Sequence, residues 1–238
     1  MKKYQIVILA GGLGTRLQPL THKIPKALVK VANRPFVFWQ LDLIASSGIE
    51  EVVLCVGYLG EQVEKAVGKL YRGLSIKYAY EQPGELLGTG GALKNAQQLL
   101  QHSFGVLYGD SYLEIEYNSV FEAHNRSDLP VTMAVWKNQN KYDSSNVVLS
   151  EDERHVVRYE KGRASNGLQY IDYGFSVFDK NLIEFRFRAG EPVALTSLQH
   201  ELSKEKLIGA FVIHKRFYEI GSWAGLAELE RYLLNHMV

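Results

Sequence analysis

The 238-residue sequence predicts an α/β fold with a doubly wound, mixed and mainly parallel sheet. Short apolar segments bounded by glycine or polar turns are typical of buried strands in such a sheet. They alternate with segments whose apolar residues recur every three or four positions, as in Leu41, Ile44 and Ala45, which indicates helices packed on the sheet. Ligands of doubly wound sheets bind at the carboxyl ends of the strands, so the residues that follow each strand are the first candidates for function.

The elements alternate regularly through the first half of the chain. We expect strands there at 4–10, 51–56, 75–80, 104–109 and 131–136. We expect helices between them at 35–46, 60–69, 89–100 and 118–126. The second half is less regular, and it predicts strands at 145–149, 155–160, 169–178 and 208–213 and a helix at 222–235.

Composition and charge exclude several classes of protein. Hydrophobic residues make up 46% of the chain and charged residues 22%, as in ordinary globular proteins. The 27 Lys and Arg residues nearly balance the 26 acidic ones, so we expect no general affinity for nucleic acid or for a membrane. No apolar stretch approaches the ~20 residues of a membrane span.

The N-terminus and the single cysteine indicate the compartment. Met1-Lys2-Lys3 leads directly into a strand without a cleavable signal. Cys55 lies in a predicted strand, where it is interpreted as a core residue rather than a nucleophile. We therefore expect a cytoplasmic protein; its oligomeric state is not readable, and the sequence is compatible with a homo-oligomer.

The most informative segment is the glycine-rich turn Gly11-Gly12-Leu13-Gly14-Thr15-Arg16-Leu17, which directly follows the first predicted strand. Such a turn presents backbone N–H groups that can bind phosphate oxygens. Arg16, inside the turn, and Lys26, in Pro25-Lys26-Ala27-Leu28-Val29, can fix a polyanion at two further points. The pair of segments predicts a phosphate-binding site.

Two other phosphate-binding motifs do not match this turn. A dinucleotide fingerprint needs a third glycine where this chain has Leu17, and an acidic residue about 20 positions on, where it has Pro35-Phe36-Val37. A Walker A loop needs G-x-x-x-x-G-K-[ST], which the chain does not contain. A different class of nucleotide-binding loop is therefore indicated.

Residues 9–21, Leu-Ala-Gly-Gly-Leu-Gly-Thr-Arg-Leu-Gln-Pro-Leu-Thr, followed by residues 25–29, resemble the signature of the sugar-phosphate nucleotidyltransferases, the nucleotide-sugar pyrophosphorylases. The resemblance covers almost the whole chain. It implies a Rossmann-like nucleotidyltransferase fold with a small sugar-binding β subregion. It also implies one domain over 1–238, with a nucleotide-binding half at about 1–136 and a sugar-binding half at about 137–238. The loop residues it assigns to the nucleotide are Leu9, Ala10, Gly11, Gly12, Gly14, Thr15, Arg16 and Lys26.

Two carboxylates are candidates for a metal site. Asp110 follows a predicted strand in Tyr108-Gly109-Asp110, and the residues alone fit a Mg²⁺ ligand and a turn aspartate equally well. The resemblance implies that Asp110 is a Mg²⁺ ligand, that Gly109 contacts the nucleotide, and that Glu219 is the second ligand. The family usually has aspartate at the position of Glu219 and proline at that of Trp223; a glutamate can still reach the cation.

A second glycine-rich turn lies in Leu87-Gly88-Thr89-Gly90-Gly91-Ala92, where a helix is predicted to begin. Glycines let a flat base approach the backbone closely, and a helix N-terminus favours electron-rich groups. The resemblance implies that Gly88 and Thr89 contact the nucleobase.

The sugar-binding residues are also implied by resemblance. Tyr159-Glu160-Lys161-Gly162 resembles the family's Glu-Lys-Pro step, in which the glutamate binds sugar hydroxyls and the lysine binds the phosphate of the sugar. Residues 170–175 resemble a strand that places Asp172 and Gly174 against the hexose. Asn146 stands where a glycine would face the sugar, so we expect a reshaped pocket.

These motifs imply an enzyme that transfers a nucleoside monophosphate from an NTP to a sugar 1-phosphate and releases pyrophosphate. Arg16, Lys26 and Asp110 are the expected catalytic residues, with Mg²⁺ as cofactor. The chain looks most similar to guanylyltransferases that use heptose or mannose 1-phosphate. A UTP- or dTTP-dependent enzyme and a non-catalytic nucleotide-sugar-binding homologue stay open as alternatives.

Overall fold

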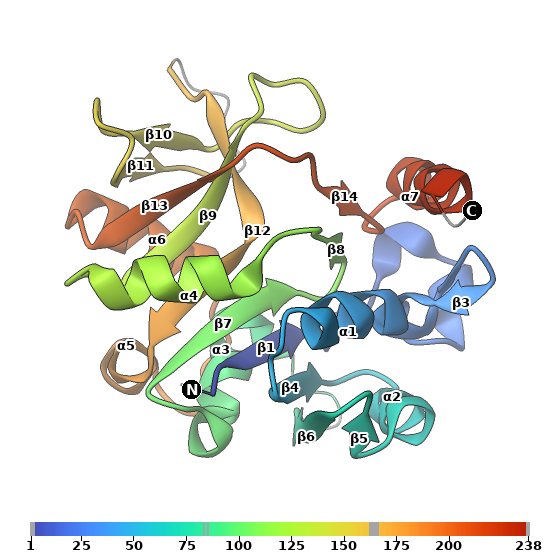
Figure 1. Cartoon of the computed structure of the whole chain (residues 1–238). Coiled ribbons are helices and arrows are strands. Elements are labelled where there is room, and N and C mark those ends of the chain that lie inside the picture. Colours follow the sequence, from blue (N-terminus) through green and yellow to red (C-terminus); the bar gives the residue numbers. More distant parts are fainter. Residues whose placement is uncertain (1–2, 83, 85, 162–166, 237–238) are drawn as a thin grey trace.

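A computed structural model of the chain describes residues 3–82, 84, 86–161 and 167–236. Its centre is a ten-stranded sheet (Figure 1). The strands of this sheet are β1 (Gln5–Leu9), β4 (Glu51–Val56), β5 (Leu70–Tyr71), β6 (Leu74–Tyr80), β7 (Ser103–Tyr108), β9 (Val131–Lys137), β10 (Val147–Leu149), β11 (Val156–Tyr159), β12 (Tyr170–Asp179) and β13 (Ile208–Ile213). Two short pairs lie outside it: β2 (Lys30–Val31) with β3 (Arg34–Pro35), and β8 (Ser111–Tyr112) with β14 (Tyr218–Glu219).

The spatial order of the main sheet is β11-β10-β12-β7-β1-β4-β6-β5, and β9 pairs with both β12 and β13. The central strands are parallel: β1 pairs in parallel with β4 and β7, and β4 with β6. β12 is antiparallel to β7 and β9, and joins the β10–β11 hairpin to the sheet. The predicted mixed, doubly wound α/β fold is therefore confirmed.

Helices cover both faces of the sheet. One core contains residues of α1 (Phe36–Ser46), α2 (Gly60–Val67) and α4 (Tyr117–Arg126). The core on the opposite face contains residues of α3 (Gly88–Asn95), α5 (Lys180–Arg186) and α6 (Leu195–Lys204). Figure 1 shows α1 and α4 in front of the sheet and α3 and α6 behind it. The last helix, α7 (Trp223–His236), lies to one side and packs in a small third core with Val31, Phe36 and Ile220.

The sequence of β1 explains why it lies at the centre. Ile6 and Ile8 point into the first core and Val7 into the second, and all three are fully buried. Cys55 of β4 is also buried, as predicted, and burial raises the pKa of its thiol to about 12. It therefore stays protonated at neutral pH and acts as a small apolar residue.

Two differences from the expected elements matter for the site. The helix expected at 89–100 is α3, which ends at Asn95 and is followed by a short 3₁₀ turn, Gln97–Leu99. Helices α5 and α6 lie in a stretch where no element is predicted. In addition, three 3₁₀ turns follow the first strand: Thr15–Leu17, Leu20–His22 and Lys26–Leu28.

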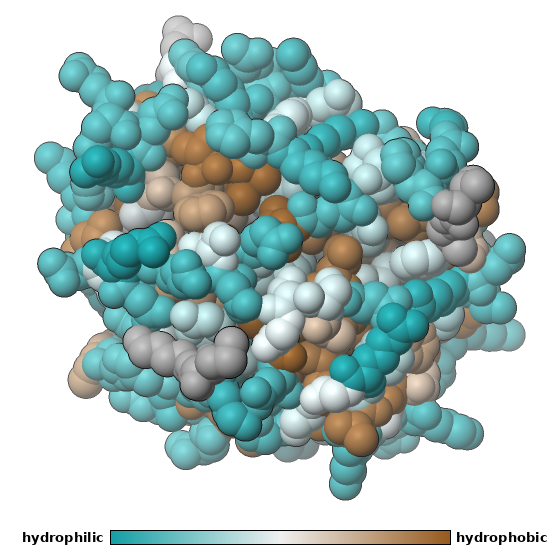
Figure 2. Space-filling model, viewed as in Figure 1, coloured by the Kyte–Doolittle hydropathy of each residue, from teal (hydrophilic) through white to brown (hydrophobic). Residues whose placement is uncertain are grey.

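The surface seen in Figure 2 is mostly hydrophilic, and its apolar residues form separate small patches. The most exposed large apolar side chains of the described residues include Leu70 of β5 and Phe185 of α5. In the described part of the chain, no helix is both long and apolar enough to cross a membrane.

Candidate active site

Two cavities lie at the carboxyl ends of the central strands and meet at Thr89, Tyr108 and Asp110, which line both. The first cavity, of about 440 Å³, lies over the glycine-rich loop after β1. The second, of about 820 Å³, lies between β12 and the segment that leads into α7. Cavities of this size can hold a small organic ligand each.

The first cavity contains nearly all the residues assigned to the nucleotide. Those lining it are Leu9, Ala10, Gly11, Gly12, Gly14, Thr15, Lys26, Gly88, Thr89 and Gly109. Arg16 is the exception, because its side chain lines the second cavity.

The glycine-rich loop leaves its amides available. Ala10 donates its N–H to Cys55 and ends the strand pairing, whereas no acceptor is found for the amides of Gly11–Gly14 in the part of the chain that the structure describes. A Cβ on Gly12 would meet no atom within 4 Å, so this position is open to a ligand. Gly14 has a φ of 63°, which favours glycine, and its carbonyl accepts a hydrogen bond from Thr21 Oγ1 (2.9 Å).

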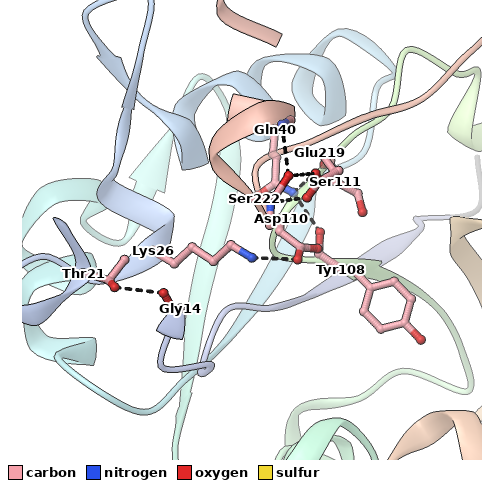
Figure 3. A network of polar contacts seen from close by, with 11 residues as sticks. Gly14, Thr21, Lys26, Gln40, Tyr108, Asp110, Ser111, Glu219 and Ser222 are labelled. Carbon is pink, nitrogen blue, oxygen red and sulfur yellow. Dashed lines mark hydrogen bonds and ion pairs between the residues drawn. The ribbon is translucent and has the colours of Figure 1, made fainter. Parts of the chain in front are cut away.

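Lys26 reaches Asp110 at the junction of the cavities. Its Nζ lies 2.7 Å from Asp110 Oδ2 (Figure 3). The turn that carries Asp110 is fixed by Gln40 of α1, whose amide donates to the carbonyls of Tyr108 (3.0 Å) and Ser111 (2.9 Å). A Cβ on Gly109 would overlap the Leu9 carbonyl oxygen, so only glycine allows the ends of β7 and β1 to lie this close. The structure thus brings Lys26 and Asp110 together at the junction of the two cavities.

The β8–β14 pair brings Glu219 next to Asp110. Glu219 pairs with Ser111 in this ladder, and the Ile220 N–H donates to the Asp110 carbonyl (2.9 Å). The Glu219 carboxylate accepts hydrogen bonds from the Gly221 N–H and from Ser222 Oγ, and it lies on the side of Asp110 opposite Lys26 (Figure 3).

Glycines make room for this longer carboxylate. A Cβ at Gly225, in the first turn of α7, would overlap Glu219 Oε1. A Cβ at Gly221 would lie 2.8 Å from Arg16 Nη2 and 3.3 Å from Asp110 Oδ2, and would overlap Glu219 Oε2. Arg16, Asp110 and Glu219, which are far apart in the sequence, therefore converge on Gly221.

The second glycine-rich turn lines the first cavity, but its glycines serve a purpose that sequence reasoning missed. A Cβ on Gly88 would lie 2.7 Å from the Val193 carbonyl oxygen, and one on Gly90 would lie 2.7 Å from the Phe187 ring. The N–H groups of Gly90 and Gly91 donate to that same Val193 carbonyl. The space that side chains would occupy at Gly88 and Gly90 is thus filled by Val193 and Phe187, from the segment before α6.

Thr89 connects the same two segments. Its Oγ1 accepts the Leu195 N–H (2.8 Å) at the start of α6, and the Val193 N–H donates to the Leu87 carbonyl (2.8 Å). Gly88 and Thr89 still border the cavity.

Glu81 is a cavity residue that the motifs did not identify. It directly follows β6, and its carboxylate lies against Gly11 and Gly57, whose added Cβ atoms would be 3.3 Å from its oxygens. Among the described residues, its carboxylate accepts one hydrogen bond, a long one from the Leu87 N–H (3.4 Å). Burial raises the pKa of this carboxyl, an effect opposed by the Leu87 N–H. Glu81 could have been identified from the sequence because, like Asp110, it comes just after a predicted strand, where ligands of such sheets bind.

The second cavity contains Asn146, Lys161, Asp172 and Gly174. The register of β12 shifts between Asp172 and Ser176, and Gly174 inside this bulge has a φ of 97°. The Gly174 N–H donates to Asp172 Oδ1 (3.0 Å), and Asn146 Oδ1 accepts the Asp172 N–H (2.8 Å). Asn146 thus holds the backbone of Asp172 in place, which a glycine could not do.

Asp172 is partly buried in this cavity. Burial raises its pKa, while the Gly174 N–H and the charge of Lys161 oppose this shift. Tyr159 and Gln199 donate to Asp172 Oδ2 only at 3.5 Å. The carboxylate is therefore available to accept a stronger hydrogen bond from a ligand.

Glu160 does not line the second cavity, unlike the other predicted sugar-binding residues. It lines a neighbouring pocket of about 340 Å³, together with Lys161 and residues of α6. Gly162, the residue after Lys161 in the resembling step, lies outside the described residues.

The far end of the second cavity contains residues that carried no signal in the sequence. Arg216 lies between two tyrosine rings, 3.6 Å from the centroid of Tyr142 and 4.7 Å from that of Tyr218, and it pairs with Glu228 (2.5 Å). Arg231 of α7 also lines this end. These residues come from loops and from one helix face, so only the fold brings them together.

The comparisons with known proteins agree with this architecture. The profile of the family described as nucleotidyl transferase matches residues 5–236. A D-glycero-alpha-D-manno-heptose 1-phosphate guanylyltransferase of Aneurinibacillus thermoaerophilus is 31% identical over 223 residues, covering 91% of this chain and 93% of the relative. A mannose-1-phosphate guanylyltransferase catalytic subunit beta of Danio rerio is 32% identical over 64% of this chain and 43% of its own length.

Among solved structures, HddC from Yersinia pseudotuberculosis, crystallised with GMP-PN, superposes with a TM-score of 0.79. It is 27% identical and covers 97% of this chain and 99% of its own. An inositol-1-phosphate CTP transferase of T. maritima, 20% identical with a TM-score of 0.78 over 98% of this chain and 95% of its own, shares the fold. The glycine-rich signature, the two joined cavities and the match over residues 5–236 together show that this chain belongs to the nucleotidyl transferase family.

Proposed function

We propose that the protein is a sugar 1-phosphate guanylyltransferase that uses GTP and a heptose 1-phosphate. The observation that carries this proposal is the junction of the two cavities, where Lys26 and Asp110 lie between the glycine-rich loop and the pocket of Asp172. A triphosphate in the first cavity and a sugar phosphate in the second would meet at this point. The division into a nucleotide-binding half and a sugar-binding half is part of the same proposal.

Glu81 supports guanine as the base. Guanine presents two adjacent donors, N1–H and the exocyclic amino group, and a carboxylate can accept both. Glu81 is half-buried in the first cavity and accepts one long hydrogen bond from the residues that the structure describes, so its oxygens have capacity for these donors. The structurally similar HddC was crystallised with a guanosine nucleotide analogue, which points to the same base.

Two observations support heptose over mannose. The matched heptose 1-phosphate guanylyltransferase has nearly the same length as this chain, whereas the mannose 1-phosphate relative matches over less than half of its own. In addition, the second cavity extends to polar groups of Asp143, Arg216 and Glu228. These groups could bind the hydroxyls of a longer sugar.

The chemistry follows from the charges at the junction. An oxygen of the sugar 1-phosphate attacks the α-phosphorus of GTP, the new P–O bond forms, and the bond to the β-phosphate oxygen breaks. Pyrophosphate leaves with the electron pair. A phosphate oxyanion is already a nucleophile, so the protein has to position the groups and neutralise their charge. Lys26 lies where it can contact the α-phosphate and the incoming phosphate, and Arg16 can contact the leaving pyrophosphate from the side of Gly221.

Asp110 and Glu219 fit a Mg²⁺ site. Both offer carboxylate oxygens beside Gly221, and Asp110 Oδ1 has no hydrogen bond in the described structure. In the described residues, no group of three or more acidic, histidine or cysteine side chains could hold a metal. A pair of carboxylates suits Mg²⁺, because this ion is commonly bound by one or two carboxylates plus substrate phosphates. When bound, Mg²⁺ would neutralise phosphate charge. We also propose that the enzyme acts in the cytoplasm, where nucleoside triphosphates are made.

Pyrophosphate release provides the test. The protein is incubated with Mg²⁺, each of GTP, UTP, dTTP, CTP and ATP, and a panel containing heptose, mannose, glucose and glucosamine 1-phosphates. We expect the highest kcat/KM for GTP with the heptose 1-phosphate. A preference for UTP or dTTP would refute the proposed specificity for GTP. Binding of a nucleotide sugar without any turnover would indicate a non-catalytic homologue.

A further inference from the structure

Tyr108 lies where the two cavities meet. It is the last residue of β7, two positions before Asp110, and its side chain borders the nucleotide side and the sugar side. Its hydroxyl oxygen is buried and has no hydrogen-bond partner within the described part of the chain. In Figure 3 the ring points away from Asp110. The hydroxyl therefore makes no polar contact that would explain a tyrosine here, and the ring is the functional part to consider.

The ring of Tyr108 contacts the side chain of Lys161. The Lys161 Nζ lies 5.4 Å from the ring centroid, within the distance of a cation–π interaction. No carboxylate of the described residues lies within 4.0 Å of this ammonium group, in contrast to Lys26, which is paired with Asp110. An aromatic face attracts an ammonium group without neutralising it, so Lys161 keeps its charge for an anionic ligand.

The surroundings restrict where this charge can act. Lys161 and Tyr108 both line the second cavity, and a Cβ on Gly174 would lie 3.7 Å from Tyr108 Cδ2. Asp172 lines the same cavity, and the charge of Lys161 opposes the rise in the pKa of its carboxyl. Lys161, Tyr108, Gly174 and Asp172 therefore line one cavity, the one in which the sugar 1-phosphate is expected.

We propose that Tyr108 is a positioning residue for the sugar 1-phosphate, because its ring holds the Lys161 ammonium group at the point where the phosphate of that substrate enters the second cavity. This inference rests on the proposed function, since it assumes that the second cavity binds a sugar 1-phosphate. It predicts that the ring, and not the hydroxyl, affects sugar 1-phosphate binding, and that it does so only through Lys161.

A double-mutant cycle tests the inference. Initial rates of pyrophosphate release with GTP and the preferred sugar 1-phosphate are measured for the wild type, Tyr108→Leu, Lys161→Ala and the double variant. Because Lys161 is exposed, we expect Tyr108→Leu to raise KM for the sugar 1-phosphate roughly 2- to 5-fold, the range of an exposed cation–π contact, and to change KM for GTP less than twofold. The double variant should be no worse than Lys161→Ala, because the ring acts through that lysine.

Two further variants separate this role from packing. Tyr108→Phe keeps the ring and should restore the wild-type KM for the sugar 1-phosphate. Lys137→Ala removes a similar contact outside the cavities, since Lys137 Nζ lies 5.8 Å from the centroid of Tyr170, and it should leave that KM unchanged. KM does not depend on the fraction of folded enzyme, so a loss of stability in Tyr108→Leu does not obscure the result.

Three results would each overturn the inference. The effects of Tyr108→Leu and Lys161→Ala could be additive, or Tyr108→Leu could raise KM for GTP as much as KM for the sugar 1-phosphate. The third is a Tyr108→Phe variant as impaired as Tyr108→Leu. A wild-type enzyme that is inactive with every sugar 1-phosphate would instead overturn the proposed function, and the inference with it. An active wild type whose sugar 1-phosphate KM is unaffected by Tyr108→Leu would overturn the inference alone.

Discussion

Replacing Glu81 with glutamine tests base recognition directly. The change keeps the size of the side chain, so it should disturb the packing against Gly11 and Gly57 little. A carboxylate can accept both guanine donors, whereas an amide can accept only one and presents an N–H₂ group to the other. Glu81→Gln should therefore remove one charge-assisted hydrogen bond and weaken the second.

The half-buried position of Glu81 sets the expected size of the effect. A hydrogen bond to a charged group contributes about 1.5–3 kcal/mol, and a buried donor left unpaired costs about 1–3 kcal/mol. Because Glu81 remains partly solvated, we expect a total loss of about 2–4 kcal/mol, which corresponds to a fall of roughly 30- to 900-fold in kcat/KM for GTP. UTP should be affected in the opposite direction, because uracil has one N–H between two carbonyls, which an amide can match.

The assay is pyrophosphate release with GTP and with UTP, at a saturating concentration of the preferred sugar 1-phosphate. Glu184→Gln is a matched control, because Glu184 is also half-buried and hydrogen-bonded, to Gln97 (3.1 Å), but lies outside both cavities. A GTP-to-UTP ratio that is the same in Glu81→Gln, Glu184→Gln and the wild type would refute the assignment of Glu81 to the base.

The pH dependence provides an independent check on the same residue. Burial raises the pKa of Glu81, so its carboxylate is protonated at a higher pH than an ordinary glutamate. KM for GTP should therefore rise on acidification while exposed glutamates are still ionised, and this rise should be absent from Glu81→Gln. A profile shared by both proteins would assign the titration to another group.

Three further predictions concern the remaining site. Lys26→Ala should lower kcat about 10²- to 10³-fold, as removal of one preorganised donor does, and a near wild-type rate of pyrophosphate release would contradict its role. Asp172→Asn should raise the thermal midpoint at neutral pH, because burial raises the pKa of this carboxyl and its ionised form therefore opposes folding above that pKa. Calorimetry should show that this gain in stability disappears at acid pH, where the carboxyl is protonated. The same variant should raise KM for the sugar 1-phosphate. Gly109→Ala should destabilise the protein by about 1–3 kcal/mol, because its Cβ would overlap the Leu9 carbonyl. Gly12→Ala should leave the thermal midpoint unchanged and raise KM for the nucleotide, because its Cβ would meet no protein atom. Equal thermal midpoints for the two variants would be inconsistent with this geometry.

Sequence patterns predicted the central part of the molecule well, for a physical reason. Strands such as β1 and β4 are buried on both faces, so apart from their first residues, Gln5 and Glu51, they are apolar, and such continuous apolar runs are easy to recognise. The loop residues after these strands were equally visible, because glycines and a lysine beside a buried strand have few structural reasons to occur together. The structure accordingly places Gly12, Lys26 and Asp110 at one site.

The rest depends on contacts between distant segments. The β8 and β14 strands are two residues each, too short for any pattern, yet their pairing brings Glu219 to Asp110. The glycines at 88, 90 and 91 were visible, but their role was not, because it depends on Val193 and Phe187 about a hundred residues later. Arg216 and Tyr142 likewise meet only in the folded chain. Short, solvated elements carry little periodic signal, so local reasoning could not have found these contacts.

The connection between Val193 and the turn at Gly88 has a thermodynamic consequence. The same α6 helix that begins at Leu195, hydrogen-bonded to Thr89, also carries Gln199, whose amide approaches Asp172. One helix thus contacts Thr89, which borders both cavities, and Asp172 of the second cavity. Any shift of the turn on GTP binding should be transmitted to the sugar pocket, and linkage requires that the sugar phosphate change the affinity for GTP by the same factor. Calorimetric titration of each substrate in the absence and presence of the other, with a non-hydrolysable GTP analogue, would measure this cooperativity. The two ratios of dissociation constants should be equal.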